Sequence, residues 1–589
     1  MSNVNILIVG SIFLLAAEEL LNGLEPHYPL YQGTKLVTAP TSDLMSRELS
    51  QTAILGSGPF QRFKYPHREY PPSPISHTME SALLLTVLFA SFISLGLLRR
   101  WARPTLPLPP GPQGNPIIGN MLAMSFVTPW KVFREWSNVY GDIMSLSLPG
   151  QTIVVLGSAK SALDLLEKRS DIYSDRPISV IHKLMSWEWN FGLMPYGETW
   201  REHRREFHQF FHQRKIPQYQ PIQLQQTRAF LRRALDSPND VGQHVRQIYA
   251  GTVLKIIYDK DIVDMTDEYV ICAQEAMHGL SETSILGAYW MDYFPILKYM
   301  PGWVPGALGK KLVEHYKPFI REMRDKPYDE FQQKENGSVA ASVASEVIER
   351  LKQRSGKSEL SLADDVLARN VTGIAYGAGA DTTTAASQAF LIAMSLYPDA
   401  QRKAQEEIDR VVGPDRLPEF EDLENLHYTR AIVLEAIRWM VVLPLGAYHR
   451  VTQDDEYRGF RIPKGATVFS NIWSILHNPD DYPEPEVFRP ERFIKDGKVD
   501  LSIQDPSIFV FGFGRRVCPG RHLANASLLI AFASILRVFD VNPIMSEDGK
   551  TFDPHSMVSA GFVSSPEYVP CSLTPRSKDT QRLINRTCA

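Results

Sequence analysis

The stretch FGFGRRVCPGR, residues 511–521, places Cys518 in a glycine-rich loop directly before an apolar helical pattern at 522–538. A cysteine that binds a metal as a thiolate needs hydrogen-bond donors and positive charge close to its sulfur. Glycines such as Gly514 and Gly520 let a loop turn tightly and aim backbone N–H groups at the sulfur, and a helix N-terminus adds its positive end. The stretch therefore predicts a thiolate ligand at Cys518. The alternative is a buried structural cysteine beside a turn.

Five residues of this stretch match, at every fixed position, the heme-binding pattern FxxGxRxCxG of the cytochrome P450 family: Phe511, Gly514, Arg516, Cys518 and Gly520. On this ground the chain resembles that family. The resemblance implies heme b as the cofactor, with Cys518 as the axial ligand of its iron. It also implies that Phe511 packs near the heme and that Arg516 pairs with a heme propionate.

A second motif lies in a long helical pattern at 361–394. The segment AGADTTT at 378–384 puts a glycine and three threonines, which are costly in helix propensity, near the middle of this pattern. It is similar to the P450 oxygen-activation motif, whose acid–alcohol pair, here Asp381 and Thr382, relays protons to bound oxygen. Gly379 would let the flat cofactor approach the helix. The alternative is an ordinary helix whose threonines bond to their own backbone.

Two charged motifs in the second half of the chain predict a structural network. Glu435 and Arg438 are three residues apart on one face of a predicted helix, which by itself usually means a solvated ion pair. The segment FRPERF at 488–493 changes this interpretation, because P450 enzymes combine such a helix with a PERF-type segment. The resemblance therefore implies that Glu435, Arg438 and Arg492 form a Glu-Arg-Arg network with a structural role.

Further residues are implied to bind the heme propionates. Trp200 and Arg204 match the WxxxR motif of the family, and His449 and Arg450 stand where the family has additional propionate contacts. Each of these matches is weak by itself. All the motifs nevertheless follow one another in the order of the family and cover about 105–565, so they support one resemblance together.

One apolar segment near the N-terminus is long enough to cross a bilayer. Residues 81–98 run for 18 positions without a charge, about 27 Å as a helix against a hydrocarbon core of roughly 30 Å. Glu80 precedes the segment and three arginines follow it, which by the positive-inside rule keeps the downstream chain in the cytosol. We predict a transmembrane anchor at 79–103 and a single-pass protein of the endoplasmic reticulum membrane. A buried core helix is the alternative.

Composition sets the remaining boundaries. The proline-rich segment 104–116 predicts a stiff, extended hinge, or else an ordinary loop. No linker or charge block divides 117–589, so a single heme domain is predicted there. Residues 1–78 form an N-terminal extension whose apolar stretch is too short for a membrane span, and we hypothesise that translation begins at Met79.

Composition and charge also limit the classes of function. The chain of 589 residues is 44% hydrophobic, which provides enough apolar material for a large core. Its net charge of −4 and its dispersed basic residues give no attraction to nucleic acid, so no nucleic-acid partner is expected. Four cysteines without regular spacing argue against a disulfide framework and a structural zinc site. Three of them match no motif and are predicted to be inert: Cys272, Cys571 and Cys588.

The resemblance implies the P450 fold, mainly α-helical with small β-sheets, after an N-terminal transmembrane helix. It implies a heme-thiolate monooxygenase that inserts one atom of O2 into a hydrophobic substrate. No part of the chain would form a flavin domain, so electrons from NADPH would come through a separate NADPH-cytochrome P450 reductase. The motifs are similar to those of fungal P450s of secondary metabolism. The alternatives are a P450-type isomerase or dehydratase and a non-catalytic heme-binding protein.

The same resemblance predicts two surfaces. Four mostly apolar segments would line the substrate pocket: 187–194, 373–378, 443–447 and 559–562. Four arginines would form a basic docking face for the electron donor, or else be ordinary solvated residues: Arg201, Arg205, Arg515 and Arg521.

Overall fold

The computed structural model describes Ser91, Ser94 and residues 106–587, without 117, 126, 286–287, 301–307, 335–341, 501, 545–560 and 567. The chain divides into two compact units, Met1–Thr105 and Leu106–Ala589. The predicted extension 1–78 and anchor 79–103 therefore lie outside the described residues, except for Ser91 and Ser94. Among the described residues, no helix combines the length and the apolar character that a membrane span needs.

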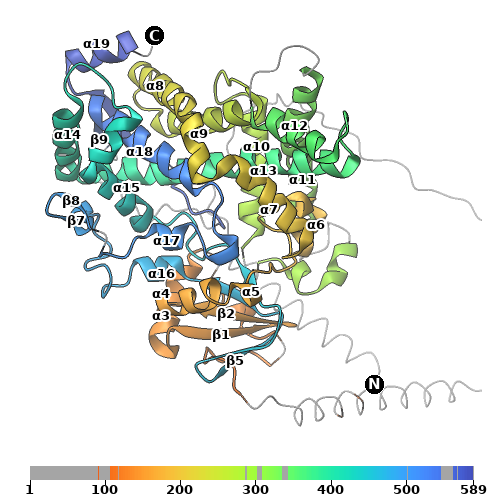
Figure 1. Cartoon of the computed structure of the whole chain (residues 1–589). Coiled ribbons are helices and arrows are strands. Elements are labelled where there is room, and N and C mark those ends of the chain that lie inside the picture. Colours follow the sequence, from red (N-terminus) through yellow and green to blue (C-terminus); the bar gives the residue numbers. More distant parts are fainter. Residues whose placement is uncertain are drawn as a thin grey trace, which may run out of the picture. The chain divides into compact units, whose positions relative to one another are not determined.

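The second unit is mainly helical with small sheets, as predicted (Figure 1). Its described part contains these α-helices: α3 (Pro129–Tyr140), α4 (Ala159–Ala162), α5 (Ser170–Tyr173), α6 (Val180–Leu184), α7 (Glu198–Phe211), α8 (Gln220–Asp236), α9 (Val241–Tyr258), α10 (Glu268–Thr283), α11 (Leu308–Lys334), α12 (Val343–Ser355), α13 (Leu362–Leu396), α14 (Pro398–Val412), α15 (His427–Trp439), α16 (Ile472–Leu476), α17 (Ser507–Val510), α18 (Arg521–Val538) and α19 (Lys578–Thr587).

The largest sheet has four strands in the order β1-β2-β6-β3. Strands β2 and β6 are parallel, whereas β1 pairs with β2 and β3 pairs with β6 in antiparallel fashion. In the described residues there are three other sheets, all two-stranded, which pair β4 with β5, β7 with β8 and β9 with β10. The strand bounds are β1 (Ile143–Leu148), β2 (Gln151–Leu156), β3 (His449–Arg450), β4 (Asp455–Tyr457), β5 (Phe460–Ile462), β6 (Thr467–Ser470), β7 (Ile494–Lys495), β8 (Lys498–Val499), β9 (Phe539–Pro543) and β10 (Cys571–Pro575).

Helix α13 forms where the pattern at 361–394 predicts it. The Ser361 hydroxyl caps its N-terminus by accepting the Asp364 N–H at 3.1 Å, and two aspartates in the first turn suit the positive end of the helix. The three threonines are accommodated because each hydroxyl donates to the carbonyl four residues earlier. These bonds are Thr382 to Ala378 at 3.1 Å, Thr383 to Gly379 at 3.0 Å and Thr384 to Ala380 at 2.8 Å.

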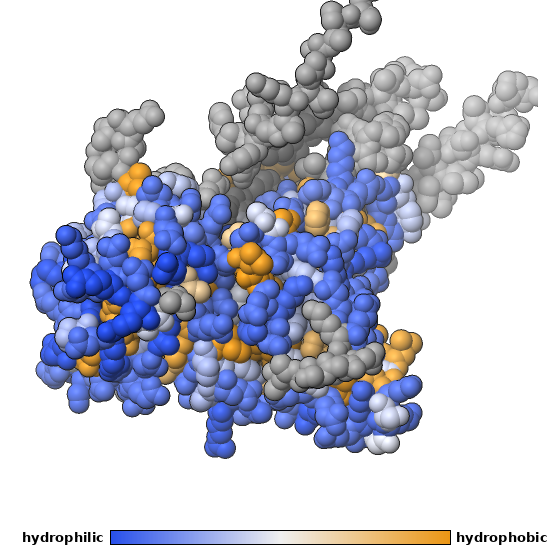
Figure 2. All heavy atoms as spheres, turned by 90° about the horizontal axis from the view of Figure 1, so that it is seen from above, coloured by the Kyte–Doolittle hydropathy of each residue, from blue (hydrophilic) through white to orange (hydrophobic). Residues whose placement is uncertain are grey.

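The core is built around α13. This helix contacts α9, α10, α11, α15 and α18, which surround it in Figure 1. Phe390 of α13 and Phe532 of α18 are fully buried and stack with their ring centres 3.7 Å apart. The surface seen in Figure 2 is mostly hydrophilic with small apolar patches, as expected when the apolar faces of the helices pack inward. Packing on several sides thus fixes the position of α13, the helix that carries Asp381 and Thr382.

Candidate active site

The loop that carries Cys518 connects α17 to α18. The Cys518 N–H donates to the Phe511 carbonyl at 2.7 Å and closes the loop. Gly514 has φ +52, and a Cβ at this position would lie 2.6 Å from the Leu166 carbonyl oxygen. Both the left-handed backbone and the close approach require glycine here. The conformation of the loop thus follows from the glycines that the sequence singles out.

The Cys518 sulfur lies at the N-terminal end of α18. Burial raises the pKa of the Cys518 thiol. The backbone N–H groups of Gly520 and Arg521 and the positive charges of Arg204 and Arg521 act in the opposite direction. Donors and cations of this kind stabilise a thiolate. The surroundings of Cys518 therefore suit a thiolate that binds a metal ion.

Helix α7 brings two of the predicted residues to this loop. Arg204 donates to the carbonyl of Val517, the residue before Cys518, at 2.7 Å. Trp200 is buried one turn earlier, and the guanidinium carbon of Arg516 lies 4.4 Å from the centre of its ring. Residues four apart share one face of a helix. The WxxxR spacing therefore directs both side chains to the same place.

Arg516 is buried and bound to backbone carbonyls. Its guanidinium donates to Ser174 at 2.7 Å, to Phe191 at 3.2 Å and to Met194 at 2.7 Å. Burial lowers the pKa of Arg516 to about 8, and the positive charge of Arg176 adds to this effect. Arg516 is thus a cation held in a place where positive charge is unfavourable.

Arg176 is a member of this site that the sequence did not reveal. It is buried and donates to the carbonyls of Gly192 at 3.0 Å and Ala447 at 2.9 Å. Burial lowers the pKa of Arg176 to about 10. Arg176 belongs to no motif, and only its position before Pro177 marks its segment as extended. Its place beside Arg516 depends on the tertiary fold.

His449 and Arg450 occupy successive positions of strand β3, so their side chains point to opposite faces of the sheet. His449 is buried, and burial together with the charges of Arg176 and Arg516 lowers its pKa. Arg450 is partly exposed and pairs with Asp175 at 3.4 Å. The structure therefore brings His449 to the buried arginines and keeps Arg450 apart from them.

Arg176, Arg204 and Arg516, which we call the arginine cluster, carry more positive charge than their surroundings neutralise. Asp175 is the carboxylate that acts on Arg176 and Arg516, and it already pairs with Arg450. Burying guanidinium groups without counter-ions is costly, and arginine binds carboxylates with two parallel hydrogen bonds. The cluster beside the Cys518 loop thus fits a ligand that combines carboxylate groups with a thiolate-binding metal.

One side of the middle of α13 is not covered by other parts of the described chain. Ala378 is exposed and Asp381 and Thr382 are partly exposed, although most of the helix around them is buried. Asp381 pairs with Arg246 of α9 at 3.1 Å. Burial raises the pKa of Asp381, and the charge of Arg246 opposes this effect. Asp381 and Thr382 are thus neighbours with different partners, since the Thr382 hydroxyl donates to its own helix.

Two glycines of α13 lie against neighbouring segments. A Cβ at Gly379 would lie 3.0 Å from a methyl group of Val253 in α9. A Cβ at Gly373 would lie 3.3 Å from both Arg324 and Trp189. These glycines let neighbouring segments pack closely against the helix. That Gly379 also lets the cofactor approach, and that the segment 373–378 lines the substrate pocket, both stay predictions.

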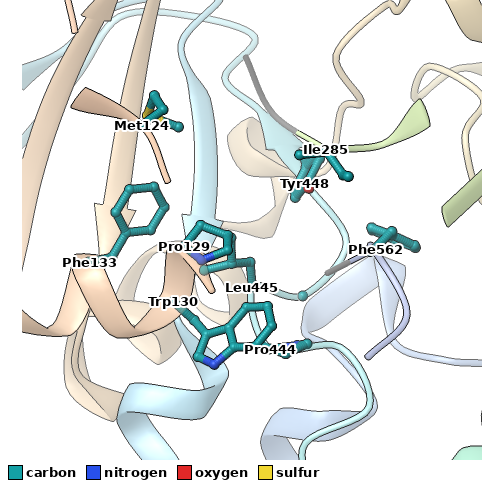
Figure 3. Close-up of a pocket in the computed structure, with 11 residues that line it drawn as sticks. Met124, Pro129, Trp130, Phe133, Ile285, Pro444, Leu445, Tyr448 and Phe562 are labelled. Atoms are coloured by element: carbon teal, nitrogen blue, oxygen red, sulfur yellow. The ribbon is translucent and has the colours of Figure 1, made fainter. Parts of the chain in front are cut away.

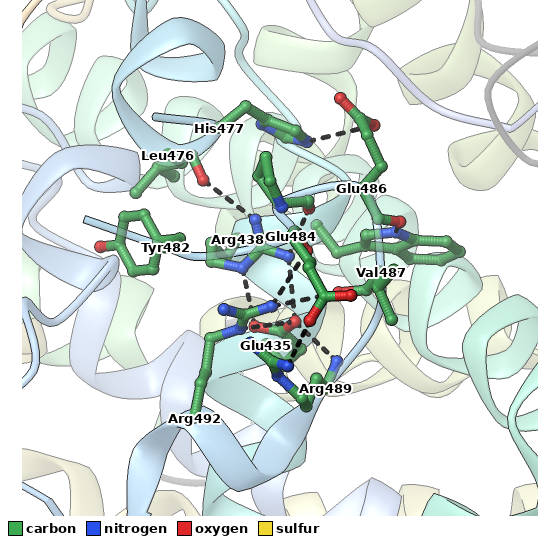
Figure 4. Close-up of polar contacts among 12 residues, drawn as sticks. Glu435, Arg438, Leu476, His477, Tyr482, Glu484, Glu486, Val487, Arg489 and Arg492 are labelled. Carbon is green, nitrogen blue, oxygen red and sulfur yellow. Dashed lines mark hydrogen bonds and ion pairs between the residues drawn. The ribbon is translucent and has the colours of Figure 1, made fainter. Parts of the chain in front are cut away.

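Glu435, Arg438 and Arg492 meet in one network (Figure 4). Arg438 donates to both carboxylate oxygens of Glu435, at 2.7 and 2.9 Å, and Arg492 donates to Glu435 at 3.1 Å. Arg438 also donates to the carbonyls of Leu476 at 2.9 Å and Pro485 at 2.8 Å. The network therefore ties α15 to the segment that follows α16.

Two neighbouring cavities lie near the arginine cluster. The larger has a volume of about 420 Å³, and its wall includes Arg176 and residues of three predicted pocket segments: Trp187, Met194, Ala447 and Phe562. The smaller, of about 20 Å³, is apolar. Figure 3 shows Phe133 and Trp130 of α3 on one side of the smaller cavity and Tyr448, Ile285 and Phe562 on the other. These last three residues line both cavities.

Comparisons with known proteins identify the family of this chain. The family model described as Cytochrome P450 matches residues 109–569. The cytochrome P450 monooxygenase COX1 of Coprinopsis cinerea is 38% identical over 518 residues, which cover 87% of this chain and 100% of the relative. The tryptamine 4-monooxygenase of Psilocybe cyanescens is 37% identical over 510 residues, which cover 85% of this chain and 99% of the relative. The cytochrome P450 monooxygenase 208 of Postia placenta is 38% identical over 511 residues, with 86% and 96% covered.

Proposed function

Because this chain belongs to the cytochrome P450 family, as a monooxygenase that binds heme b, we propose that it oxidises a hydrophobic compound of fungal secondary metabolism. One oxygen atom from O2 enters the substrate. Electrons come from NADPH through a separate cytochrome P450 reductase. The observation that carries the proposal is that the arginine cluster lies beside the Cys518 loop. Groups that bind carboxylates are thus next to a cysteine whose surroundings suit a thiolate.

When bound, heme b would supply an iron centre that activates O2. In this proposal the Cys518 sulfur, in the loop of Phe511, Gly514 and Gly520, would bind the iron. The arginine cluster, Trp200 and His449 would hold the heme propionates. Arg450 supports this group from outside through its pair with Asp175.

The propionate assignment predicts that Arg204→Met weakens heme retention. Removing one charged partner of a carboxylate should speed heme loss by about tenfold. The rate is measured as heme transfer to excess apomyoglobin. Arg205→Met is the matched control, because Arg205 is the exposed next residue of α7, and its heme loss should equal that of the unchanged protein. Equal rates for the Arg204 and Arg205 variants would contradict the assignment.

We assign Thr382 and Asp381 to proton delivery. The Thr382 hydroxyl lies on the open side of α13, and Asp381 lies next to it with a raised pKa. Thr382→Val keeps the side-chain shape and removes the hydroxyl, so product per NADPH consumed should fall by about tenfold while heme binding stays unchanged. Thr383→Val is the control, because that hydroxyl is buried against Gly379. Product yield and NADPH oxidation are measured together, and equal coupling in both variants would refute the assignment.

A basic face around the Cys518 loop is our proposal for reductase docking. Arg205 is exposed, and Arg515 donates to the Tyr196 hydroxyl at 3.0 Å. Arg521 donates to the Cys518 carbonyl at 3.3 Å. Arg201 contributes less net charge, because it pairs with Glu198 at 2.6 Å. An acidic partner would therefore be drawn to the side of the unit where the thiolate lies.

We also propose that the protein is anchored in the endoplasmic reticulum membrane with its heme domain in the cytosol. The support comes from the sequence alone, namely the 18 uncharged residues at 81–98 and the arginines that follow them. This location would place the heme domain beside a membrane reductase that uses NADPH.

The reduced carbon monoxide difference spectrum of the membrane fraction tests the proposed function. A band at about 450 nm in that fraction, together with NADPH-dependent oxidation in the presence of reductase, is the expected result. A band at about 420 nm, or none, would refute the thiolate-heme assignment. A normal band without any consumption of O2 would instead favour an isomerase or a dehydratase.

A further inference from the structure

Among the residues that the structure describes, one carboxylate in the wall of the 420 Å³ cavity has no counter-ion, that of Asp292. We propose that this cavity takes organic cations, with the positive nitrogen paired with Asp292 and an apolar body in the rest of the cavity. This inference rests on the proposed function and narrows its substrate class from hydrophobic compounds to amine-bearing ones.

The contacts of Asp292 leave one of its oxygens available. Oδ1 accepts the N–H groups of Val180 at 2.6 Å and Ile181 at 3.1 Å. The Ser179 hydroxyl lies 3.1 Å from both oxygens and can donate its single hydrogen to only one of them at a time. Within the described part of the chain, Oδ2 therefore has that shared hydroxyl and no backbone donor. A carboxylate oxygen has two acceptor sites, so Oδ2 can bind a further donor or cation.

No protein cation neutralises Asp292 among the residues that the structure describes. Lys183, also in the cavity wall, pairs with Glu188 at 3.4 Å. Arg176 is bound to backbone carbonyls beside Arg516. Burial lowers the pKa of His182 to about 4, so this imidazole is neutral at physiological pH.

The negative charge of Asp292 is costly because the group is largely buried and no described cation neutralises it. Burial raises the pKa of Asp292, and the hydrogen bonds from Ile181, Val180 and Ser179 only partly oppose this effect. A ligand cation would supply the missing counter-charge in surroundings less polar than water, where an ion pair is stronger. The cavity thus distinguishes ligands by their charge as well as by their shape.

The rest of the wall suits the apolar body of such a cation. Trp187, Tyr289, Tyr448 and Phe562 provide aromatic surface, which also attracts ammonium groups. The volume of about 420 Å³ lies within the usual range for small-molecule sites, about 300–1,000 Å³. A compound with one aromatic ring and a short amine side chain fits these requirements.

Two probes of equal shape test the inference. Phenethyltrimethylammonium carries a permanent charge and cannot bind iron through its nitrogen, and (3,3-dimethylbutyl)benzene is its neutral counterpart. Binding to the heme-loaded full chain is measured by calorimetry, which does not depend on oxidation. Asp292→Asn keeps an oxygen that can accept from Val180 and Ile181. This substitution should lower the affinity for the cation by about tenfold. It should change the affinity for the neutral probe by less than about twofold.

Glu188→Gln is the matched control, because Glu188 also lines the cavity but is exposed and already paired with Lys183. It should change the affinity for either probe by less than about twofold, because solvent screens the charges of both partners. The unchanged protein gives a second test, since it should bind the cation at least about tenfold more tightly than 2-phenylethanesulfonate. Equal or tighter binding of the sulfonate, no binding of the cation, or an equal loss for both probes in Asp292→Asn would overturn the inference. Failure of the proposed function would appear separately, in the carbon monoxide spectrum.

Discussion

Cys518→Ser is expected to abolish the carbon monoxide band at about 450 nm and to lower substrate oxidation by at least about a thousandfold. Serine has nearly the same size as cysteine, but its hydroxyl does not form a thiolate ligand. The loop should keep its shape, because the bonds that close it use the Cys518 N–H and the Val517 carbonyl. The measurements are the reduced spectrum and the rate of product formation with saturating reductase.

Cys272→Ser is the control for this experiment. The Cys272 sulfur donates to the Phe319 carbonyl at 3.1 Å, and burial raises the pKa of its thiol to about 12. Such a thiol stays protonated at physiological pH and has no thiolate character. This variant should retain the band at about 450 nm. Retention of that band in Cys518→Ser would show that another residue is the ligand.

The parts of the site that could be predicted are those whose spacing is local. Trp200 and Arg204 are four residues apart on one helix, so their common direction follows from helix geometry alone. The glycines of the Cys518 loop are similar, because the left-handed backbone at Gly514 is a property of a few residues. The main helix of the fold was predictable for the same reason, since Ser361 caps it and its pattern continues to its end.

Contacts between distant segments could not be predicted in this way. Arg176 reaches Arg516 only because the strand and helix segments between them fold back on one another, and no spacing rule connects the two residues. Arg246 is the partner of Asp381 for the same reason, since α9 packs along α13. A helical pattern shows that a residue such as Gly379 faces a neighbour but does not identify that neighbour. For Gly379 the structure shows that Val253 of α9 is such a neighbour.

The Glu435 network lies between these two cases. Its members come from two segments, and each motif by itself is more often an ordinary surface pair. The resemblance to a family supplied the connection, and the structure brings the three side chains together. Arg438 is fully buried and Arg492 nearly so. Breaking this network therefore costs more free energy of unfolding than breaking a surface ion pair does.

Glu435→Gln is therefore expected to lower the free energy of unfolding by about 3–5 kcal/mol. Glu435 accepts four hydrogen bonds: from Arg438 Nε at 2.7 Å, a terminal Arg438 nitrogen at 2.9 Å, the Arg489 N–H at 2.8 Å and Arg492 Nε at 3.1 Å. Both carboxylate oxygens face donors. An amide at this position must turn its NH2 group toward one set of them, whichever way it is oriented.

The variant would thus leave two buried guanidinium groups without a negative partner and place a donor against donors. Urea unfolding of the heme-loaded protein, together with its heme content, measures the effect. Glu484→Gln is the matched control, because Glu484 pairs with Arg489 at 2.6 Å while both side chains are exposed to solvent. That change should cost less than about 1 kcal/mol. If the two variants were equally stable, Glu435 would be an ordinary ion pair, and the link between α15 and the segment after α16 would have to come from packing alone.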